Sequence, residues 1–382
     1  MKKYRILTPG PTPVPEEVKA ALFREPLYHR GLVFKNIMKE LQENFKKLLK
    51  TERVPVFLTS SGTGAMEASI VNFFKPEEDV LIVVGGKFGE RFFKIAKRFG
   101  LNPICYEIEW GDYPKVEKIE KYLKENKNIK GVFIQICETS TGTFYPYKEI
   151  GEVCKKYDAL LIADGITAVG VYNIEFDKSN IDILITGSQK ALMTPPGVSA
   201  IIWNEKAHKR LGVNKRYKYY FDLEEEYKNQ KEKFQTAYTP SVNLYAALNE
   251  ALKVINKIGI EKIEKNTSIM SKATLKAFEE INLKPLSKNP AIGVSAICLP
   301  DSIDGNKLIK FIRENFNMYI AGGQGHLKGK IFRLCHFGYI DIFDTLNQIS
   351  AVEFALSSLG YNFNLGTATK KAMEIISQYK GA

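Results

Sequence analysis

The sequence of 382 residues has few cysteines and lacks long apolar runs. No stretch of 18 or more apolar residues occurs, so we expect no membrane-spanning helix and no membrane partner. The N-terminus lacks the apolar core and cleavage site of a signal peptide, which predicts a cytoplasmic protein. The five cysteines are scattered without a Cys-x-x-Cys spacing, so we expect free thiols and neither disulfides nor a metal site: Cys105, Cys137, Cys154, Cys298 and Cys335.

Basic residues are in excess, with 55 Lys and Arg against 43 Asp and Glu, for a net charge of +12. The sequence nevertheless lacks an Arg-rich block with interleaved aromatics and lacks a helix-turn-helix pattern, so we expect no nucleic-acid partner. The positive residues are mostly lysines beside glutamates on helical faces. Such a surface favours small anionic substrates.

Short runs of Val, Ile and Leu alternate with amphipathic helical segments. This alternation predicts an α/β fold, in which helices cover both faces of a mostly parallel central sheet. The predicted strands span residues 54–59, 80–84, 103–106, 131–136, 159–163, 181–186 and 198–203. The predicted helices span residues 16–22, 34–49, 65–74, 90–99, 116–126, 150–157 and 241–258.

The chain is too long for one ordinary core, so we expect two domains. A proline-rich arm at 1–15 precedes a large domain at 16–257, and a smaller α+β domain follows at 258–382. Residues 205–235 have little usable periodicity. Within the smaller domain we expect helices at 260–280, 304–315 and 341–359, and strands at 292–299 and 331–337.

Lys190 follows the predicted strand 181–186 closely. Partial desolvation lowers the pKa of such an amine and favours its nucleophilic form, which can form a Schiff base with an aldehyde cofactor such as pyridoxal phosphate. Most lysines after a strand are ordinary loop residues. Strand 159–163, however, ends in Asp164, 26 residues before Lys190. A lysine combined with an aspartate that pairs with the pyridine nitrogen is the pattern of a pyridoxal phosphate site.

Small residues follow the first strand in the segment 60–64, Ser-Ser-Gly-Thr-Gly. A strand-to-helix turn of this kind presents free backbone N–H groups and a helix dipole to a phosphate, and Ser61 and Thr63 add hydroxyl groups. The alternative is a Ser or Thr cap for the helix that follows.

Three further positions have the right chemistry for such a cofactor site. Phe88 lies between glycines after the second strand, where an aromatic ring could stack on a pyridine ring; the alternative is a core phenylalanine. Thr139 belongs to a hydroxyl-rich turn that could bind a ring substituent or form a capped turn. Arg333 lies within an apolar strand and needs an anion partner, either a structural carboxylate or a substrate carboxylate.

Because ligands of open α/β sheets bind beyond the carboxyl ends of the strands, we expect these residues to converge. The chain resembles the class V aminotransferases of the alanine–glyoxylate and serine–pyruvate group, which have fold type I. The resemblance extends from Pro9-Gly10-Pro11 to Arg333. Its most specific markers are Ser-Gly-Thr-Gly-Ala-Met-Glu at 61–67, Asp164, and Gly-Ser-Gln-Lys at 187–190.

The resemblance implies a pyridoxal 5′-phosphate enzyme that transfers an amino group from alanine or serine to glyoxylate or pyruvate. It implies Lys190 and Asp164 as catalytic residues, and Arg333 with Gly10 as the substrate site. The implied cofactor contacts are Ser61, Gly62, Thr63, Phe88, Thr139, Asp164, Gln189 and Lys190, with Thr236 and Thr239 reaching the phosphate of a neighbouring subunit. It also implies a homodimer with shared active sites, in which the N-terminal arm crosses to the partner.

Several alternatives stay open at this point. An aspartate donor would need a second cation, for which Arg30, His326 and Lys328 are candidates. A cysteine desulfurase or lyase would need a loop cysteine, and neither Cys137 nor Cys335 lies in a loop. A non-catalytic subunit associated with a soluble hydrogenase is the third alternative. The element Thr236-x-x-Thr239-Pro240 is also compatible with a simple helix start.

Overall fold

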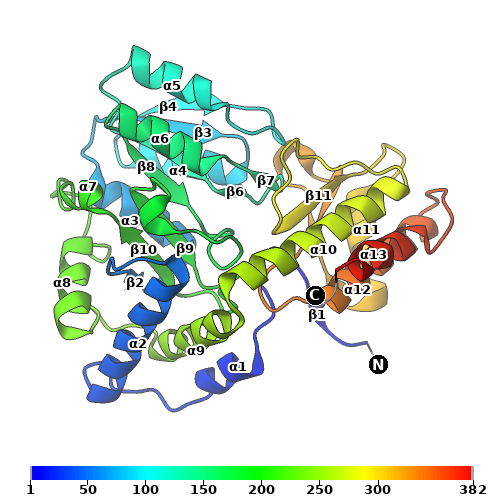
Figure 1. The fold of residues 1–382 in the computed structure, drawn as a ribbon, viewed down its shortest axis with the longest axis horizontal. Helices are drawn as coiled ribbons and strands as arrows, with labels where there is room; N and C mark the ends of the chain where they lie inside the picture. The colour runs from blue at the N-terminus through cyan, green and yellow to red at the C-terminus, as the bar shows by residue number, and fades with distance from the viewer. Residues whose placement is uncertain (1, 380–382) are drawn as a thin grey trace.

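A seven-stranded sheet forms the centre of the protein, whose computed structural model describes residues 2–379 (Figure 1). Its strands are β2 (Val56–Leu58), β3 (Asp79–Val84), β4 (Asn102–Glu107), β5 (Gly131–Gln135), β8 (Leu160–Asp164), β9 (Ile183–Gly187) and β10 (Ser199–Trp203). They lie in the order β2-β10-β9-β8-β5-β3-β4. The strands from β9 to β4 pair in parallel, and only β10 runs antiparallel to its neighbours. The predicted mostly parallel sheet is therefore confirmed.

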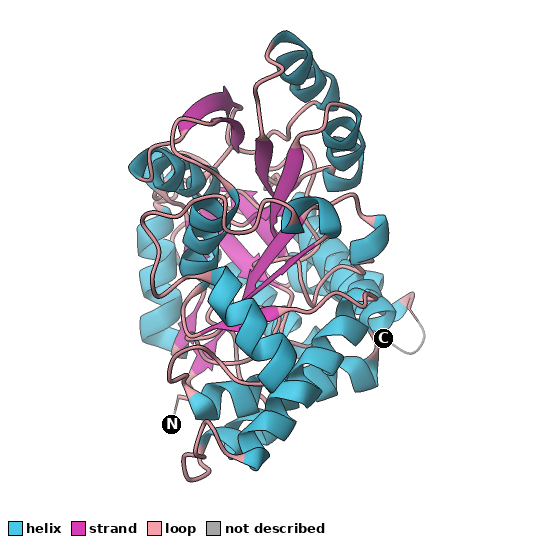
Figure 2. Ribbon diagram, turned by 90° about the vertical axis from the view of Figure 1, so that its left-hand side faces the viewer, coloured by secondary structure: helices cyan, strands magenta, loops and turns pink. Residues whose placement is uncertain are grey.

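Helices cover both faces of this sheet, as Figure 2 shows. Leu160 and Ile162 of β8 pack on one face, against α3 (Gly62–Phe73) and α4 (Lys87–Arg98). Leu161 and Ala163 pack on the opposite face. That face is covered by α2 (Leu32–Leu49), α5 (Val116–Glu125), α6 (Tyr147–Lys156) and α9 (Val242–Ile258). Burial of both faces explains why the strands are continuous apolar runs in the sequence.

The C-terminal third of the chain forms a second core beside the large sheet (Figure 1). Its three-stranded antiparallel sheet has the order β11 (Val294–Cys298), β14 (Ile331–Cys335), β13 (Ala321–Gly322). Around it lie α10 (Ile260–Glu280), α11 (Gly305–Phe316), α12 (Ile342–Ser358) and α13 (Thr367–Ser377). The short strand β1 (Arg5–Ile6) pairs with β12 (Met318–Tyr319), so the N-terminus also belongs to this region.

The long helix α10 connects the two cores. Ile260 at its start packs with the large-sheet core, whereas Ala277 and Phe278 near its end belong to the C-terminal core. The chain passes from α9 to α10 at Gly259, where the backbone φ angle is +90°. The expected domain division after residue 257 lies next to this turn and stays a prediction.

Helix α8 (Leu223–Lys233) lies in the segment 205–235, whose sequence has little usable periodicity. Its buried side chains are mostly polar: Leu223, Glu226, Asn229 and Gln230. Gln230 covers the outer strand β2, because its side-chain amide accepts from Phe57 N (2.9 Å) and donates to Phe57 O (2.7 Å). Polar burial of this kind has no apolar periodicity, which explains why the helix was missed.

Two further properties concern residues 2–379 only. No helix in this range combines the length and the hydropathy that crossing a lipid bilayer requires. The same range contains no group of three or more His, Cys, Asp or Glu side chains arranged to hold a metal ion.

Candidate active site

Lys190 and Asp164 lie at the same edge of the large sheet, because β8 and β9 are parallel neighbours. Asp164 ends β8, opposite Ile185 of β9, and Lys190 follows the end of β9 by three residues. The turn that carries Lys190 is fixed by Ser188, whose hydroxyl donates to Pro195 O (2.7 Å) and whose N–H donates to Val198 O (2.8 Å). The strand ends therefore deliver an amine and a carboxylate to one place.

Lys190 is half-buried, and desolvation lowers the pKa of its amine to about 8. The nearby guanidinium of Arg333 lowers the pKa further, while Asp164 acts in the opposite direction. The N-terminal arm covers this lysine. Lys190 Nζ donates to Pro9 O, and Thr12 Oγ1 donates to Lys190 O at 2.8 Å.

Gly10 is required for this close approach of the arm. Its φ angle is +102°, a conformation that other residues rarely adopt, and a Cβ atom there would run into the Lys190 side chain. The resemblance implied an arm that crosses to a second subunit. Residues 9–12 contact Lys190 of their own chain, because pairing of β1 with β12 brings the arm over the site. The crossing of the arm to a partner subunit stays a prediction.

Asp164 is 5% exposed, and burial raises the pKa of its carboxyl group to about 7. Its Oδ1 accepts from Ile166 N at 2.9 Å, and no other hydrogen bond to this carboxylate occurs within residues 2–379. A carboxylate this deeply buried is only partly ionised at neutral pH. A protonated nitrogen beside it would restore its charge.

A cradle for an anion is present at the start of α3. The Ser61 side chain makes no capping hydrogen bond, so it does not satisfy the first backbone N–H groups of the helix. The simple capping alternative is therefore wrong for Ser61. Gly187 approaches this turn closely, since a Cβ on Gly187 would lie 3.3 Å from Gly62 N. Gln189 borders the same turn, and its buried Oε1 has no hydrogen-bond partner.

Phe88 is the second residue of α4 and not a turn residue, because α4 begins three residues earlier than predicted. Buried Glu138 fixes its backbone by accepting from Phe88 N and Gly89 N, each at 3.1 Å. On the side chain, Arg91 lies over the Phe88 ring, 4.9 Å from its centroid. Neither contact was predicted from the sequence. For the first contact a usable signal was present, because an acidic residue, Glu138, lies between the apolar strand residues and the hydroxyl-rich turn.

Thr139 connects the large sheet to the C-terminal region. Its hydroxyl bonds to Thr167 Oγ1 at 2.8 Å, and Thr167 Oγ1 donates to Cys137 O at 3.1 Å. Thr139 therefore donates to Thr167, and its oxygen can still accept a hydrogen bond from a ligand. Its backbone carbonyl accepts from Arg333 Nη1 at 2.7 Å.

Arg333 in β14 is 6% exposed and has no carboxylate partner within residues 2–379. Besides Thr139 O, it donates from Nε to Gly322 O at 3.0 Å. Both acceptors are neutral carbonyl groups, and burial lowers the pKa of Arg333 to about 10. Within residues 2–379 no carboxylate forms an ion pair with Arg333, although the charge of buried Glu138 acts to raise its pKa. Of the two alternatives for its anion partner, this favours a substrate carboxylate, which stays a prediction.

Within residues 2–379, neither Thr236 nor Thr239 forms a hydrogen bond with Lys190, Asp164 or the turn at 61–64. The Thr236 hydroxyl donates to Tyr238 O at 2.5 Å, and Thr239 is exposed. Tyr238 packs on the rings of Tyr219 and Tyr220, with centroids 5.5 and 5.6 Å away. The contact of both threonines with a partner's phosphate stays a prediction.

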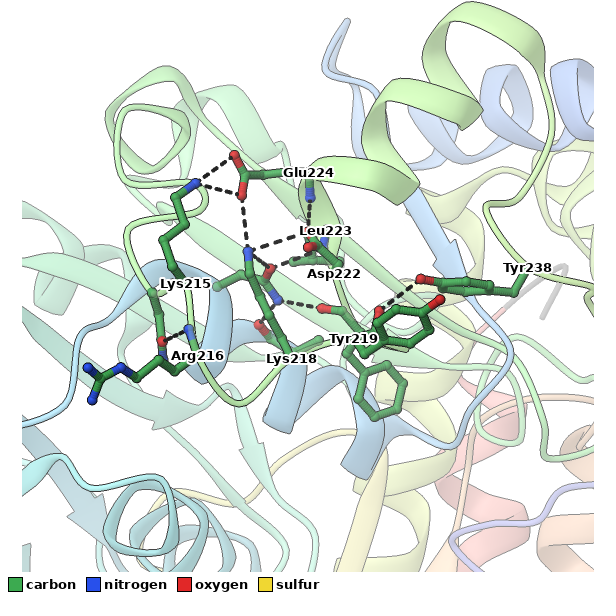
Figure 3. A network of polar contacts seen from close by, with 12 residues as sticks. Lys215, Arg216, Lys218, Tyr219, Asp222, Leu223, Glu224 and Tyr238 are labelled. Carbon is green, nitrogen blue, oxygen red and sulfur yellow. Dashed lines mark hydrogen bonds and ion pairs between the residues drawn. The ribbon is translucent and has the colours of Figure 1, made fainter.

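A network around Lys218 holds the loop that carries these tyrosines (Figure 3). The Lys218 side chain is only 3% exposed and pairs with Asp222 (3.3 Å) and Glu224 (3.2 Å). It also donates to Asn72 Oδ1 of α3 at 3.0 Å. The same helix that begins at the anion cradle therefore anchors the tyrosine loop.

Known proteins give the family of this chain. The family model described as aminotransferase class V matches residues 15–330. An uncharacterized aminotransferase of Methanocaldococcus jannaschii is 40% identical over 94% of both chains. The chain belongs to the class V aminotransferase family. The present chain is also 36% identical to a soluble hydrogenase 42 kDa subunit of Anabaena cylindrica. The match covers 98% of this chain and 99% of the Anabaena protein.

Two functionally named relatives are also similar to it. A serine–glyoxylate aminotransferase of Methylorubrum extorquens is 32% identical over 98% of this chain and 96% of its own. The crystal structure of a ureidoglycine–glyoxylate aminotransferase from Bacillus subtilis superposes with a TM-score of 0.94 at 28% identity, covering 99% of each chain. The expected fold type I and the enzyme class, a transaminase, are thereby confirmed.

The family implies pyridoxal phosphate as cofactor, and the residues of this aminotransferase fit it. The unpartnered Gln189 Oε1 and the uncapped turn at Gly62 and Thr63 form a polar cradle. The amine of Lys190 and the carboxylate of Asp164 have the chemistry that an aldehyde and a pyridine nitrogen require.

Proposed function

We propose that this enzyme transfers the amino group of a small monocarboxylate amino acid, such as alanine or serine, to glyoxylate or pyruvate. The observation that carries the proposal is Arg333, a buried cation without a carboxylate partner within residues 2–379. A buried charge without a counter-ion is unfavourable, so an anion that binds there is stabilised. The planar guanidinium suits the carboxylate of an amino acid.

The relatives support glyoxylate as the amino acceptor. The serine–glyoxylate and ureidoglycine–glyoxylate enzymes both carry glyoxylate in their names, and both match nearly the whole chain. The first of these names also supports serine as a donor.

The residues of the site would divide the work as follows. Pyridoxal phosphate, when bound, supplies the aldehyde and the electron sink that amino transfer requires. Lys190 would hold the cofactor covalently and, when the donor displaces it, move the proton of the donor's Cα. Asp164 would keep the pyridine nitrogen protonated. Ser61, Gly62, Thr63 and Gln189 would bind the phosphate.

A dicarboxylate donor such as aspartate is less well supported, because it would need a second free cation. Arg30 is already used, since it donates to Gln235 Oε1, Thr236 O and Ala237 O, each at 3.1 Å. His326 packs on Trp110 at a centroid distance of 4.6 Å, and Lys328 is exposed.

Cysteine desulfuration is not supported by the thiols of this site. Cys137 and Cys335 are buried within strands, and burial raises the pKa of each to about 12. Both are therefore protonated at neutral pH and unsuited to nucleophilic attack. A non-catalytic hydrogenase subunit, as one relative's name suggests, would have no reason to retain the amine, carboxylate and guanidinium together.

We also propose that the enzyme is a homodimer. Large apolar side chains are exposed on the segment before and at the start of α2: Phe23 (88%), Tyr28 (71%), Leu32 (72%) and Val33 (60%). Arg30 ties this segment to residues 235–237, next to the expected contact with a partner's phosphate. Light scattering of the purified protein should give twice the mass of one chain, and a monomer would contradict the proposal.

The decisive experiment combines Lys190→Ala with a panel of amino donors and 2-oxo acids. Wild-type enzyme should retain pyridoxal phosphate and be fastest with monocarboxylate donors and glyoxylate or pyruvate. Lys190→Ala should lose turnover and the visible absorbance of lysine-bound cofactor, whereas the exposed Lys178→Ala control should keep both. Turnover by Lys190→Ala, or a preference for aspartate, would contradict the assignment. Sulfide released from cysteine would favour the desulfurase alternative.

A further inference from the structure

Arg91 contacts two parts of the candidate site from the second turn of α4. Its Nη1 donates to Thr63 Oγ1 at 3.0 Å, in the first turn of α3. Its guanidinium also lies 4.9 Å from the centroid of the Phe88 ring, at three residues' separation on the same helix. The aromatic contact holds the guanidinium in place behind the anion cradle.

The hydrogen bond from Arg91 determines how the Thr63 hydroxyl can act. A hydroxyl group has one proton to donate and two lone pairs to accept. Since Thr63 Oγ1 accepts from Arg91, its own proton remains available to a second partner. Thr63 is also in the first turn of α3, where backbone N–H groups lack intrahelical acceptors. The hydroxyl proton and these N–H groups can therefore serve the same anion.

No carboxylate forms an ion pair with Arg91 within residues 2–379, although the charge of Arg91 acts at longer range to lower the pKa of Asp164. The neighbouring Glu90 pairs with Lys87 at 2.8 Å instead. Glu67, which lines the same surface cavity of about 960 Å³ as Arg91, is half-buried and has no ion pair in this range. A cation that is not held in an ion pair stabilises an anion bound nearby, at the start of α3.

We propose that Arg91 is a positioning residue for the cofactor phosphate: it orients the Thr63 hydroxyl as a donor into the cradle and adds a positive charge that is not held in an ion pair. The proposal rests on the proposed function, because the ligand it concerns is pyridoxal phosphate. Arg91 would act through Thr63 and Phe88 and would not touch the reacting atoms.

The test measures dissociation constants of the cofactor-free enzyme for pyridoxal phosphate and for pyridoxal, which lacks the phosphate. Arg91→Met should weaken pyridoxal phosphate binding about tenfold or more, the size expected for a charge-assisted hydrogen bond, and pyridoxal binding far less. Thr63→Val, which keeps the side-chain shape, should do the same. The double variant should lose less than the sum of the two single losses, because both substitutions remove the hydrogen bond between Arg91 and Thr63, whereas only Arg91→Met also removes the positive charge.

Lys94→Met is the matched control, since it removes one positive charge from an exposed position on the same helix, one turn further on. It should leave both dissociation constants unchanged within about twofold, as surface substitutions usually do. If Arg91→Met does not fold, Arg91→Lys is the second test variant. It keeps the charge but shortens the donor, and it should change the ratio of the two constants in the same direction.

Equal losses for the two ligands, full additivity of the two substitutions, or an Arg91→Met effect no larger than that of Lys94→Met would overturn the inference. Failure of the proposed function is a different result. In that case wild-type protein itself would bind pyridoxal phosphate no better than pyridoxal and would not transaminate.

Discussion

Arg333 Nη1 donates to the backbone carbonyl of Thr139 at 2.7 Å, across 194 residues of sequence. This bond joins the C-terminal sheet to the turn that follows β6 (Cys137–Glu138) beside the large sheet. Because the carbonyl group is neutral, it orients the guanidinium without neutralising its charge. The proposed substrate site therefore depends on how the two cores are packed against each other.

Substitution Arg333→Lys should raise the KM for the amino donor by about tenfold to a hundredfold, because lysine keeps the charge but loses the two-point grip. The affinity for pyridoxal phosphate should change little. Steady-state kinetics with an amino acid and with the corresponding amine, which lacks the carboxylate, would separate the effects, since only the amino acid should suffer. Arg313→Lys, at an exposed position of α11, is the control. Equal losses with both donors would indicate a purely structural role.

The rate at which cofactor-free enzyme captures pyridoxal should rise with pH and level off above about pH 8. The reason is that only the neutral amine attacks an aldehyde, and the pKa of Lys190 is lowered to about 8. Absorbance measurements from pH 6 to 10, followed by borohydride reduction and peptide mapping, would test this. A rate that keeps rising towards pH 10.5, the ordinary value for lysine, would contradict it.

Asp164→Asn should lower kcat by about a hundredfold or more, since an amide cannot keep a pyridine nitrogen protonated. The substitution leaves the proposed phosphate-binding turn unchanged, so the cofactor should still bind. In the cofactor-free wild type, infrared difference spectra should reveal a carboxyl group with a pKa of about 7, raised by burial, and this signal should be absent in the variant. A variant that retains most of its kcat would exclude Asp164 from catalysis.

Gln230→Ala should destabilise the protein by about 2 to 4 kcal/mol, because it leaves the backbone N–H and carbonyl of Phe57 buried without these partners. The free energy of unfolding from urea titration would measure the loss. Lys228→Ala, at an exposed position of the same helix, should change it by less than about 0.5 kcal/mol. Equal stability of the two variants would show that α8 contributes little to the edge of the sheet.

Much of the large domain could be predicted because its strands are buried on both faces and its helices on one. The apolar runs around β5, β8 and β9 and the small-residue turns at their ends are local signals. They predicted that Asp164 ends one strand and that Lys190 closely follows another, as the structure has them. The missed helix α8 has no such signal. It buries Glu226, Asn229 and Gln230, whose polar groups are satisfied by specific partners.

The residues of the candidate site that follow strand ends could be predicted from the sequence. The contacts between side chains of different helices and turns could not. Arg91 is three residues after Phe88, and this helical spacing was readable from the sequence. Its bond to Thr63 was not, because that contact joins two different helices. The same holds for Glu138, whose acceptors are used by a helix 50 residues away.

The sequence by itself determined the alternation of strands and helices, the small-residue turn at 60–64 and the placement of an amine and a carboxylate after strand ends. Only the tertiary structure decided which charges are neutralised. It gives Arg30 three acceptors on residues 235–237 and leaves Arg333 with two neutral carbonyl groups. The physical reason is that local sequence sets backbone periodicity, whereas the partner of a buried polar group is selected by packing between segments far apart in the chain.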